Sequence, residues 1–272
     1  LKYGLSSNLI GHVTLNTDFA DADVDEQQFN VTPYRLFFPE KRRFFLENSD
    51  IFRFGTWFMD MLFFSRQIGI DPDTGREVPV DAGAKLAGRL GGFELGLMNV
   101  KTRAEGPTPF ANYSVVRVKR PLMANSYIGV MGVNKESGSA TDPYNRAGGL
   151  DAKFVFFKDL TVRGYAARTW SPGLRGRDYT AGGEMEYRSN LVMFFAGKAT
   201  VQANYNPTVG FVMRSDQSPS YLAAVLAPRP KIRGVRELNF GGVLFHSPYT
   251  RGVLQTQDWQ PCVWRTPRVS GL

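Results

Sequence analysis

Short segments in which apolar and polar side chains alternate recur along this chain, and they limit strongly what it can fold into. In residues 160–169, Leu160 and Val162 alternate with Thr161 and Arg163, and residues 84–90, 113–120 and 182–189 follow the same period. Successive side chains of a β-strand point to opposite faces, so this period predicts strands with one apolar and one polar face. The high glycine content, 28 residues, also favours strands and tight turns over long helices.

The connections between these segments indicate what kind of sheet they build. Tight turns are predicted at Gly91-Gly92, at 121–124, at 158–159 and at 189–190, and longer polar loops are predicted at 100–111, 135–145 and 170–178. Short connections at one end and long ones at the other are typical of outer-membrane β-barrels. A soluble β-sandwich, whose polar strand faces would meet water, is the alternative.

We therefore expect an all-β fold, a transmembrane antiparallel up-and-down β-barrel with a short helical or loop cap. Residues 1–272 would form about 14–16 strands, as a fragment in which both ends of the barrel are truncated. The predicted strands include 59–67 and 207–214. No signal peptide opens the sequence, so the protein is either cytoplasmic or the interior of a longer precursor, and the pattern of strands and loops favours the precursor.

The polar faces of the strands carry the charged residues, which the barrel prediction places in the lumen. The simplest role for these charged residues is to line a solvated lumen in which they pair with one another, and selective anion conduction is the alternative. The predicted lumen-lining residues are Lys85, Arg89, Glu94, Arg117, Lys119, Lys153, Arg163, Glu184 and Glu186.

One aromatic-rich stretch, the cap segment (residues 33–58), does not follow the strand period. It repeats itself as Phe37-Phe38-Pro39-Glu40 and Phe44-Phe45-Leu46-Glu47, with basic residues between the two repeats. Pro39 in a first helical turn and the spacing of the phenylalanines predict a short amphipathic helix. The expected cap or docking residues are Phe37, Phe38, Glu40, Arg42, Arg43, Phe44, Phe45 and Glu47.

Counting strands back from the Gly91-Gly92 turn places the cap segment at the periplasmic mouth or inside the lumen. The strand expected at 59–67 is part of that count. In either place the phenylalanine pairs would be buried, since exposed aromatic patches of this size are rare. Residues 41–43 would then meet carboxylates of the lumen. The alternative is that the segment is a docking surface for a partner.

Several classes of function find little support in the sequence. A formal charge of +8 is compatible with nucleic acid, but the basic residues are scattered and form no run of five, so no nucleic-acid partner is expected. Cys262 is the only cysteine, and there is no phosphate-binding loop or dinucleotide fingerprint, so no cofactor is expected. Asp21, Asp23 and Asp25 form a weak calcium candidate. No catalytic residues are predicted.

The N-terminal residues also resemble a known bacterial family of unknown function. The resemblance rests on "LKYGLSSNL", the string "FFPEKRRFFLENSDIFRFG", "LFFSRQIG" and "GREVPVDAGAKLAGRLGGFELGLMNVKT", and it continues more loosely to Arg214. Members of that family typically combine an N-terminal carbohydrate-binding (family nine-like) domain with a C-terminal outer-membrane barrel. The resemblance implies location in the outer membrane of a Gram-negative-type bacterium, and it implies no catalytic residue.

We therefore expect a non-enzymatic outer-membrane protein that acts as a pore, transport or assembly module of the cell envelope. Its partners would be outer-membrane lipid and lipopolysaccharide, and other envelope proteins docking at the periplasmic mouth. One alternative is the membrane module of a carbohydrate-binding or carbohydrate-processing protein whose binding or active domain is absent from this chain. The other is a soluble β-rich binding protein.

Overall fold

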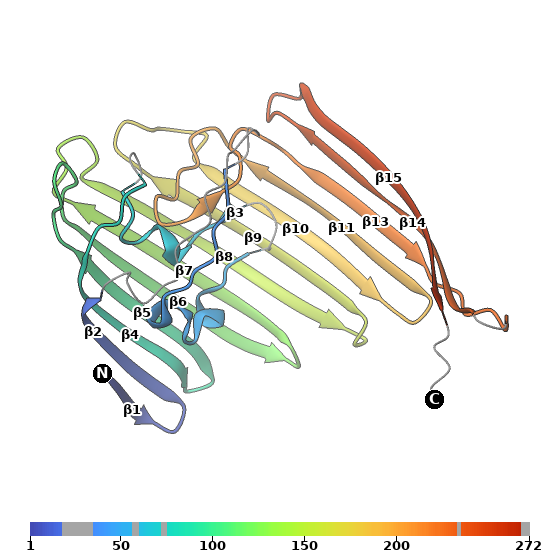
Figure 1. Ribbon diagram of the computed structural model, residues 1–272, viewed down its shortest axis with the longest axis horizontal. Helices are drawn as coiled ribbons and strands as arrows, with labels where there is room; N and C mark the ends of the chain where they lie inside the picture. Colours follow the sequence, from blue (N-terminus) through green and yellow to red (C-terminus); the bar gives the residue numbers. More distant parts are fainter. Residues whose placement is uncertain (18–34, 56–59, 72–74, 233–234, 268–272) are drawn as a thin grey trace.

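A single large antiparallel sheet dominates the computed structural model of the protein (Figure 1), which describes residues 1–17, 35–55, 60–71, 75–232 and 235–267. The main sheet has thirteen strands, and neighbours in the sheet are also neighbours in the sequence of its strands. They are β1 (Lys2–Ser6), β2 (Leu9–Thr17), β4 (Val80–Leu90), β5 (Phe93–Thr102), β6 (Ala111–Met123), β7 (Ser126–Ser137), β8 (Tyr144–Phe156), β9 (Leu160–Trp170), β10 (Tyr179–Arg188), β11 (Val192–Val201), β13 (Ser220–Leu226), β14 (Val235–Pro248) and β15 (Leu254–Pro267).

The predicted alternation of connections is confirmed for the central strands. Residues 91–92, 124–125, 157–159 and 189–191 join strands at one end of the sheet, which we name the short-turn end. Residues 103–110, 138–143 and 171–178 join strands at the opposite, long-loop end. Asn125 and Lys158 have positive φ angles, as tight turns require.

The all-β prediction is confirmed, but the sheet is not closed into a barrel. Within the described residues, β1 and β15 are edge strands with one neighbour each, and the main sheet has thirteen strands rather than 14–16. Figure 1 shows the first and last strands at opposite margins of the sheet. Closure of a barrel requires these two edges to be paired, and the described strands do not pair them with each other.

A second layer lies against one face of the sheet. This inner layer comprises residues 35–55, 60–71 and 202–213, and it contains α1 (Arg43–Leu46), the 3₁₀ helices η2 (Ser49–Phe52) and η3 (Ser65–Gln67), and a two-stranded pair of β3 (Asp60–Met61) with β12 (Phe211–Val212). We name the sheet face that it contacts the inner face. None of the helices in the described ranges is long enough to cross a membrane.

The inner layer overturns three local predictions. Residues 59–67 and 207–214 were expected to be full strands of the barrel. Among the described residues 60–67 and 207–214, only two in each segment form strand, and those pair with each other. The helix begins at Arg43 rather than near Pro39. Apolar residues run together in these segments because the layer is buried on several sides, which imitates a buried strand in the sequence.

The direct pairing of β2 with β4 also corrects the strand count that was used to place the cap segment. β2 and β4 are direct antiparallel neighbours, so the chain between them leaves and re-enters the sheet at the long-loop end. Without a strand at 59–67, the count that led to the periplasmic mouth no longer holds. Residues 35–55 lie against the inner face of the sheet.

The hydrophobic core lies between the inner layer and the long-loop half of the inner face. Phe44, Phe45, Phe52, Leu62 and Ile68 supply the inner-layer side of it, all at most 5% exposed. The main sheet, which we name the wall, supplies the other side of the core with Val100, Tyr113, Val115, Met131, Val133, Ala147, Ala167 and Val201. Burying a phenylalanine side chain contributes about 1.5–3 kcal/mol, so this cluster is the main force that holds the two layers together.

Candidate functional site

The nine predicted lumen-lining residues all lie on the inner face of the sheet. Directly paired positions share a face, and the register pairs Lys153 with Arg163 and Arg89 with Glu94. Their surroundings differ along the strands. Lys85 and Arg117 are buried beneath the inner layer, whereas Arg89 is exposed near the short-turn end, where it pairs with Glu94 at 2.7 Å.

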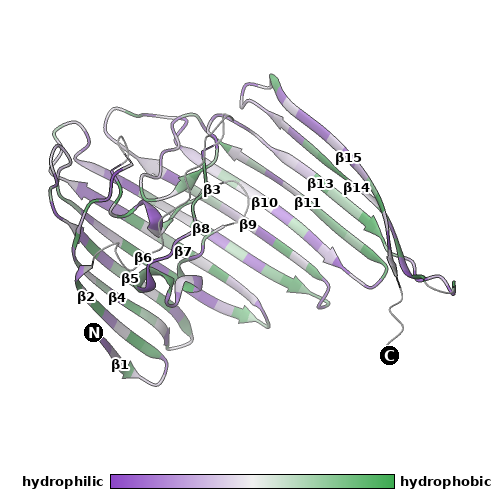
Figure 2. Ribbon diagram, viewed as in Figure 1, coloured by the Kyte–Doolittle hydropathy of each residue, from purple (hydrophilic) through white to green (hydrophobic). Residues whose placement is uncertain are grey.

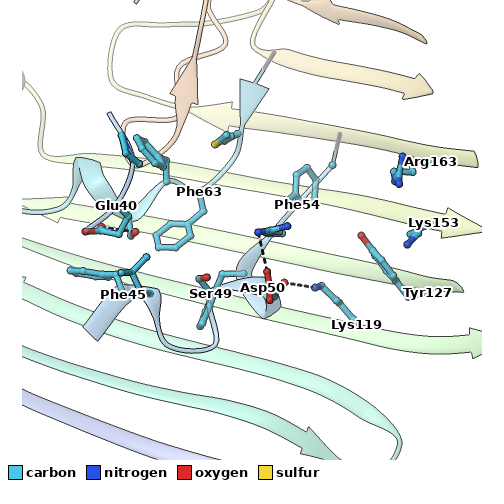
Figure 3. A pocket seen from close by; sticks show the side chains of 18 of the residues that line it. Glu40, Phe45, Ser49, Asp50, Phe54, Phe63, Lys119, Tyr127, Lys153 and Arg163 are labelled. Atoms are coloured by element: carbon cyan, nitrogen blue, oxygen red, sulfur yellow. Dashed lines mark hydrogen bonds and ion pairs between the residues drawn. The ribbon is translucent and has the colours of Figure 1, made fainter. Parts of the chain in front are cut away.

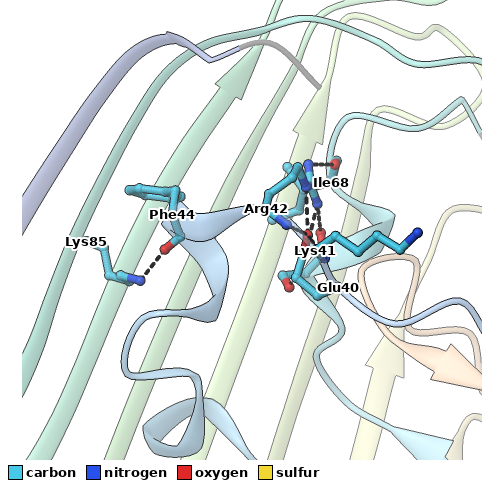
Figure 4. A network of polar contacts seen from close by, with 7 residues as sticks. Glu40, Lys41, Arg42, Phe44, Ile68 and Lys85 are labelled. Atoms are coloured by element: carbon cyan, nitrogen blue, oxygen red, sulfur yellow. Dashed lines mark hydrogen bonds and ion pairs between the residues drawn. The ribbon is translucent and has the colours of Figure 1, made fainter. Parts of the chain in front are cut away.

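Two of these wall residues bind the backbone of the cap segment. The Lys85 ammonium donates to the carbonyl oxygen of Phe44 (Figure 4) and to that of Glu47 at 2.6 Å. The Lys119 ammonium donates to the carbonyl of Asp50 at 2.9 Å. The last carbonyls of a helix have no partner within it, and a cation next to them is favourable. Lys85 thereby serves as the partner for the end of α1.

The basic residues of the cap segment have partners inside the inner layer rather than on the wall. Glu40 and Arg42 form a pair with Nε–Oε1 and Nη2–Oε2 distances of 2.8 Å, and Arg42 also donates to the carbonyls of Ile68 and Ser65, both at 2.7 Å. Arg43 pairs with Glu47 at 3.2 Å. For Arg42 and Arg43, the expected contact with lumen carboxylates is thus replaced by pairs within the cap segment.

The ionisation of Glu40 reflects this arrangement. Burial, the largest single influence, disfavours the charged carboxylate, but the hydrogen bonds and positive charge of Arg42 together outweigh it. The pKa of Glu40 is therefore lowered. The Glu40–Arg42 pair acts as an internal brace of the cap segment, which joins residues 40–42 to η3.

A fully buried ion pair lies where the covered and open parts of the inner face meet. Arg117 and Asp151 form two hydrogen bonds, at 2.6 and 2.7 Å, with side chains at most 1% exposed. Asp151 also accepts the backbone N–H of Gly55 at 3.3 Å, and the Arg117 guanidinium lies over the ring of Phe54, 5.5 Å from its centroid. The pair therefore connects β6, β8 and the end of the cap segment.

Three phenylalanine rings of the cap segment occupy places where the wall carries glycine. A Cβ added at Gly83 would lie 3.1 Å from the Phe44 ring, one at Gly96 would lie 2.9 Å from Phe52, and one at Gly149 would lie 2.5 Å from Phe54. The contacts at Gly96 and Gly149 leave no room for a side chain unless the ring moves, and the contact at Gly83 is tight. We name these three positions the glycine sockets. The lack of a side chain at each lets a ring approach the backbone of β4, β5 or β8.

Sequence reasoning missed several buried acidic groups, among them Asp151 and Asp60. Asp60 is 3% exposed and accepts a hydrogen bond of 2.5 Å from the Tyr165 hydroxyl. Burial raises the pKa of Asp60, and the hydrogen bond offsets only part of that effect. Burial also raises the pKa of the neighbouring Tyr205 hydroxyl. No signal in the sequence places Asp60 beside Tyr165, because it was assigned to a barrel strand.

A cavity of about 1070 Å³ lies between the inner layer and the short-turn half of the inner face (Figure 3). Its wall side includes Lys119, Tyr127, Lys153, Arg163 and the two glutamates Glu184 and Glu186. Both glutamates bind Arg163, at 2.6 and 3.4 Å, so their charges are engaged in an ion-pair network.

Four of the predicted cap and docking residues lie in the core or border the cavity, whereas Phe38, Arg42, Arg43 and Glu47 belong to neither. Phe44 and Phe45 are buried in the core, Phe37 stacks on Phe64 with centroids 5.1 Å apart, and Glu40 and Phe45 also border the cavity. The calcium candidate Asp21, Asp23 and Asp25 lies outside the described residues. Within the described ranges, no group of three or more acidic, histidine or cysteine side chains could hold a metal ion.

The fold and this site define an all-β protein in which one large antiparallel sheet carries a folded layer on its charged face. Residues 1–88 match the family model described as a domain of unknown function (DUF5916), so the chain carries a DUF5916 domain at its N-terminus. The match covers β1, β2, the cap segment and most of β4. No curated protein and no solved structure matches the chain.

Proposed function

We propose that this chain forms much of the wall, together with the internal layer, of a non-enzymatic outer-membrane β-barrel that acts as a transport or assembly module of the cell envelope. The observation that carries the proposal is the distribution of polarity between the two faces of the sheet. The face opposite the inner layer, which we name the outer face, exposes large apolar side chains along the middle of its strands, while the charged side chains of the strand middles lie on the inner face.

The outer face has the composition of a lipid-facing surface. Leu97, Val116, Ile128, Val130 and Leu150 alternate with inner-face positions and are all exposed, Leu150 by 63%. Figure 2 shows apolar and polar positions alternating along these strands. Water-soluble proteins rarely expose continuous apolar patches larger than a few hundred Å², and this one extends across neighbouring strands.

The charged and aromatic residues of the outer face support the same proposal. On β5 to β9, the charged residues of this face all lie within four residues of a strand end: Lys101, Arg120, Glu136, Arg146 and Arg168. Exposed aromatic rings also lie at the two ends: Trp170 and Tyr179 near the long loops, and Phe93, Phe156 and Tyr187 near the short turns. Membrane barrels have an apolar band flanked by aromatic girdles.

The two open edges fit a wall that is completed by additional strands. The outward-facing backbone groups of β1 and β15 have no strand partner within the described residues. Backbone groups exposed to lipid cost several kcal/mol each when unpaired, so a membrane location requires both edges to be paired in a closed barrel. Under this proposal the inner layer fills the long-loop half of the lumen and leaves the short-turn half hollow.

Replacement of Leu150 by arginine tests the lipid-facing assignment. In a bilayer, an arginine at a lipid-facing position costs about 2–4 kcal/mol near the midplane and much less near the interfaces. We therefore expect Leu150→Arg to reduce strongly the yield of folded, heat-modifiable protein in lipid vesicles. Leu174→Arg is the matched control, because Leu174 lies in the 171–178 loop and is 37% exposed.

The two variants separate the membrane proposal from a soluble fold. Equal folding of both variants in vesicles, or full solubility of the protein without detergent, would contradict the proposal. Conductance in planar bilayers then distinguishes transport from assembly. A filled barrel should be nearly silent and should conduct after the inner layer is loosened.

A further inference from the structure

The cavity beneath the inner layer has an uneven distribution of charge. Lys119, Lys153 and Arg163, from β6, β8 and β9, border the same side of it (Figure 3). Arg163 binds Glu184 and Glu186, and Arg188 also pairs with Glu186. These contacts account for both glutamates on the sheet side of the cavity. On its inner-layer side, Glu40 pairs with Arg42 and Asp50 pairs with Arg53.

The two lysines are compensated unequally. Glu94 lies directly opposite Lys119 in the register, whereas no acidic residue lies directly opposite Lys153. Lys119 donates to a neutral backbone carbonyl, that of Asp50 at 2.9 Å, and Lys153 has no hydrogen-bond or ion-pair partner among the residues that the structure describes. The register also sets Lys153 directly opposite Arg163. Like charges at directly opposed positions destabilise a sheet, so a negative charge placed beside Lys153 would relieve this repulsion.

One part of the cavity lining is suited to an apolar group. Phe54 and Phe63 border it from the inner layer, and Phe195 borders it from the wall, where it stacks on Tyr221 with ring centroids 4.9 Å apart. Tyr127, on the strand between those of the two lysines, also faces the cavity and bonds Asp151 through its hydroxyl at 3.2 Å. Ligand sites commonly combine an apolar lining with a few convergent polar groups.

We propose that this cavity binds a small organic anion, with its carboxylate or phosphate at Lys119 and Lys153 and an aromatic or otherwise apolar body against the phenylalanine rings. Charge-assisted hydrogen bonds from the two ammonium groups would hold the anionic group. The site is built from side chains of the inner face and of the inner layer, and its argument uses no membrane contact. It therefore stands independently of the membrane proposal.

Binding of simple aromatic probes to the detergent-solubilised full chain tests this site. Benzoate and phenyl phosphate carry the expected anionic group, benzyl alcohol and benzylamine have similar bodies without it, and acetate has the charge without the body. Titration calorimetry should show binding of benzoate or phenyl phosphate and much weaker binding of the other three probes. Equal binding of benzoate and benzyl alcohol would overturn the proposal, as would absence of binding by both aromatic anions.

Charge removal at one lysine gives the second test. Lys153→Met should weaken binding of the anionic probes about tenfold, which corresponds to one lost charge-assisted hydrogen bond, and should leave benzyl alcohol unaffected. Lys158→Met is the matched control, because Lys158 is exposed in the 157–159 turn at the same end of the sheet. Protease resistance equal to that of the parent shows that both variants fold. Equal affinities of the two variants for benzoate and phenyl phosphate would refute the assigned site.

Discussion

The two halves of the inner face are built from the same strands but serve different purposes. The long-loop half carries Val100, Val115, Val133 and Ala147 and is covered by packed phenylalanine rings of the inner layer. The short-turn half carries Lys119, Lys153, Arg163 and two glutamates and borders a cavity. Along single strands such as β6 and β8, side chains that fill space thus give way to side chains that carry charge. The period of a strand determines which face a residue occupies, but the identity of each residue determines whether that part of the face is filled or open.

The ion pair at the boundary of the two halves should give the largest effect on stability. Arg117→Met leaves Asp151 buried without its cation, and breaking a buried pair in this way costs about 3–5 kcal/mol. We expect a loss of that size in the free energy of unfolding, measured by urea titration in detergent. Arg89→Met is the control, since the exposed Arg89–Glu94 pair should contribute at most about 1 kcal/mol. Equal losses in the two variants would mean that the boundary pair has no special role.

Truncation of a phenylalanine ring in the filled, long-loop half should destabilise the protein more than truncation of a ring in the open, short-turn half. Phe45 is 4% exposed, with Arg42 stacked over its ring at 4.2 Å, and Phe45→Ala should destabilise the protein by about 3 kcal/mol. It should also loosen the inner layer, which would be seen as faster proteolysis of the cap segment and as raised conductance in bilayers. Phe195→Ala, in the half-buried cavity wall, should cost clearly less. The comparison fails if Phe195→Ala is as damaging as Phe45→Ala.

The acidic groups of the inner layer should give a smaller effect that depends on pH. The raised pKa of Asp60 means that its contribution to stability is present below its ordinary pKa of 3.8 and is lost as the pH rises through the folded value. Asp60→Asn should therefore raise the melting temperature at pH 7, and the gain should shrink as the pH falls towards 4.

Glu40 should show the opposite sign, because its pKa is lowered. Its contribution is present above its ordinary pKa of 4.5 and is lost in acid, so Glu40→Gln should lower the melting temperature at pH 7 and matter less at low pH. Asp50→Asn, at an exposed carboxylate of the same segment, controls for the change of net charge. Changes of the same sign at positions 60 and 40 would contradict this assignment.

The sequence predicted the strands of the main sheet far better than the structure of the inner layer. Period-two alternation and turn residues located β4 to β11, because both signals are local, and they also placed Lys85, Lys153 and Glu184 on one face. They could not show which groups those residues contact, since the bond between Lys85 and Phe44 joins residues 41 positions apart. Residues 59–67 were assigned wrongly because burial on several sides produces the same apolar run as a wall strand. Closure was also beyond prediction, because it depends on what pairs with the two edges.

The glycine sockets link the evolution of the two layers. A glycine within a strand ordinarily weakens it, yet Gly83, Gly96 and Gly149 each accommodate one ring of the cap segment. A larger residue at any of these positions would push its ring out, and a smaller residue in place of the ring would leave a void. In related sequences, substitutions at 83 and 44, at 96 and 52, and at 149 and 54 should therefore occur together. The shape of the wall thus matches one particular cap segment. If the cap segment were exchanged between distant relatives, the protein should not pack correctly unless the glycine sockets were exchanged as well.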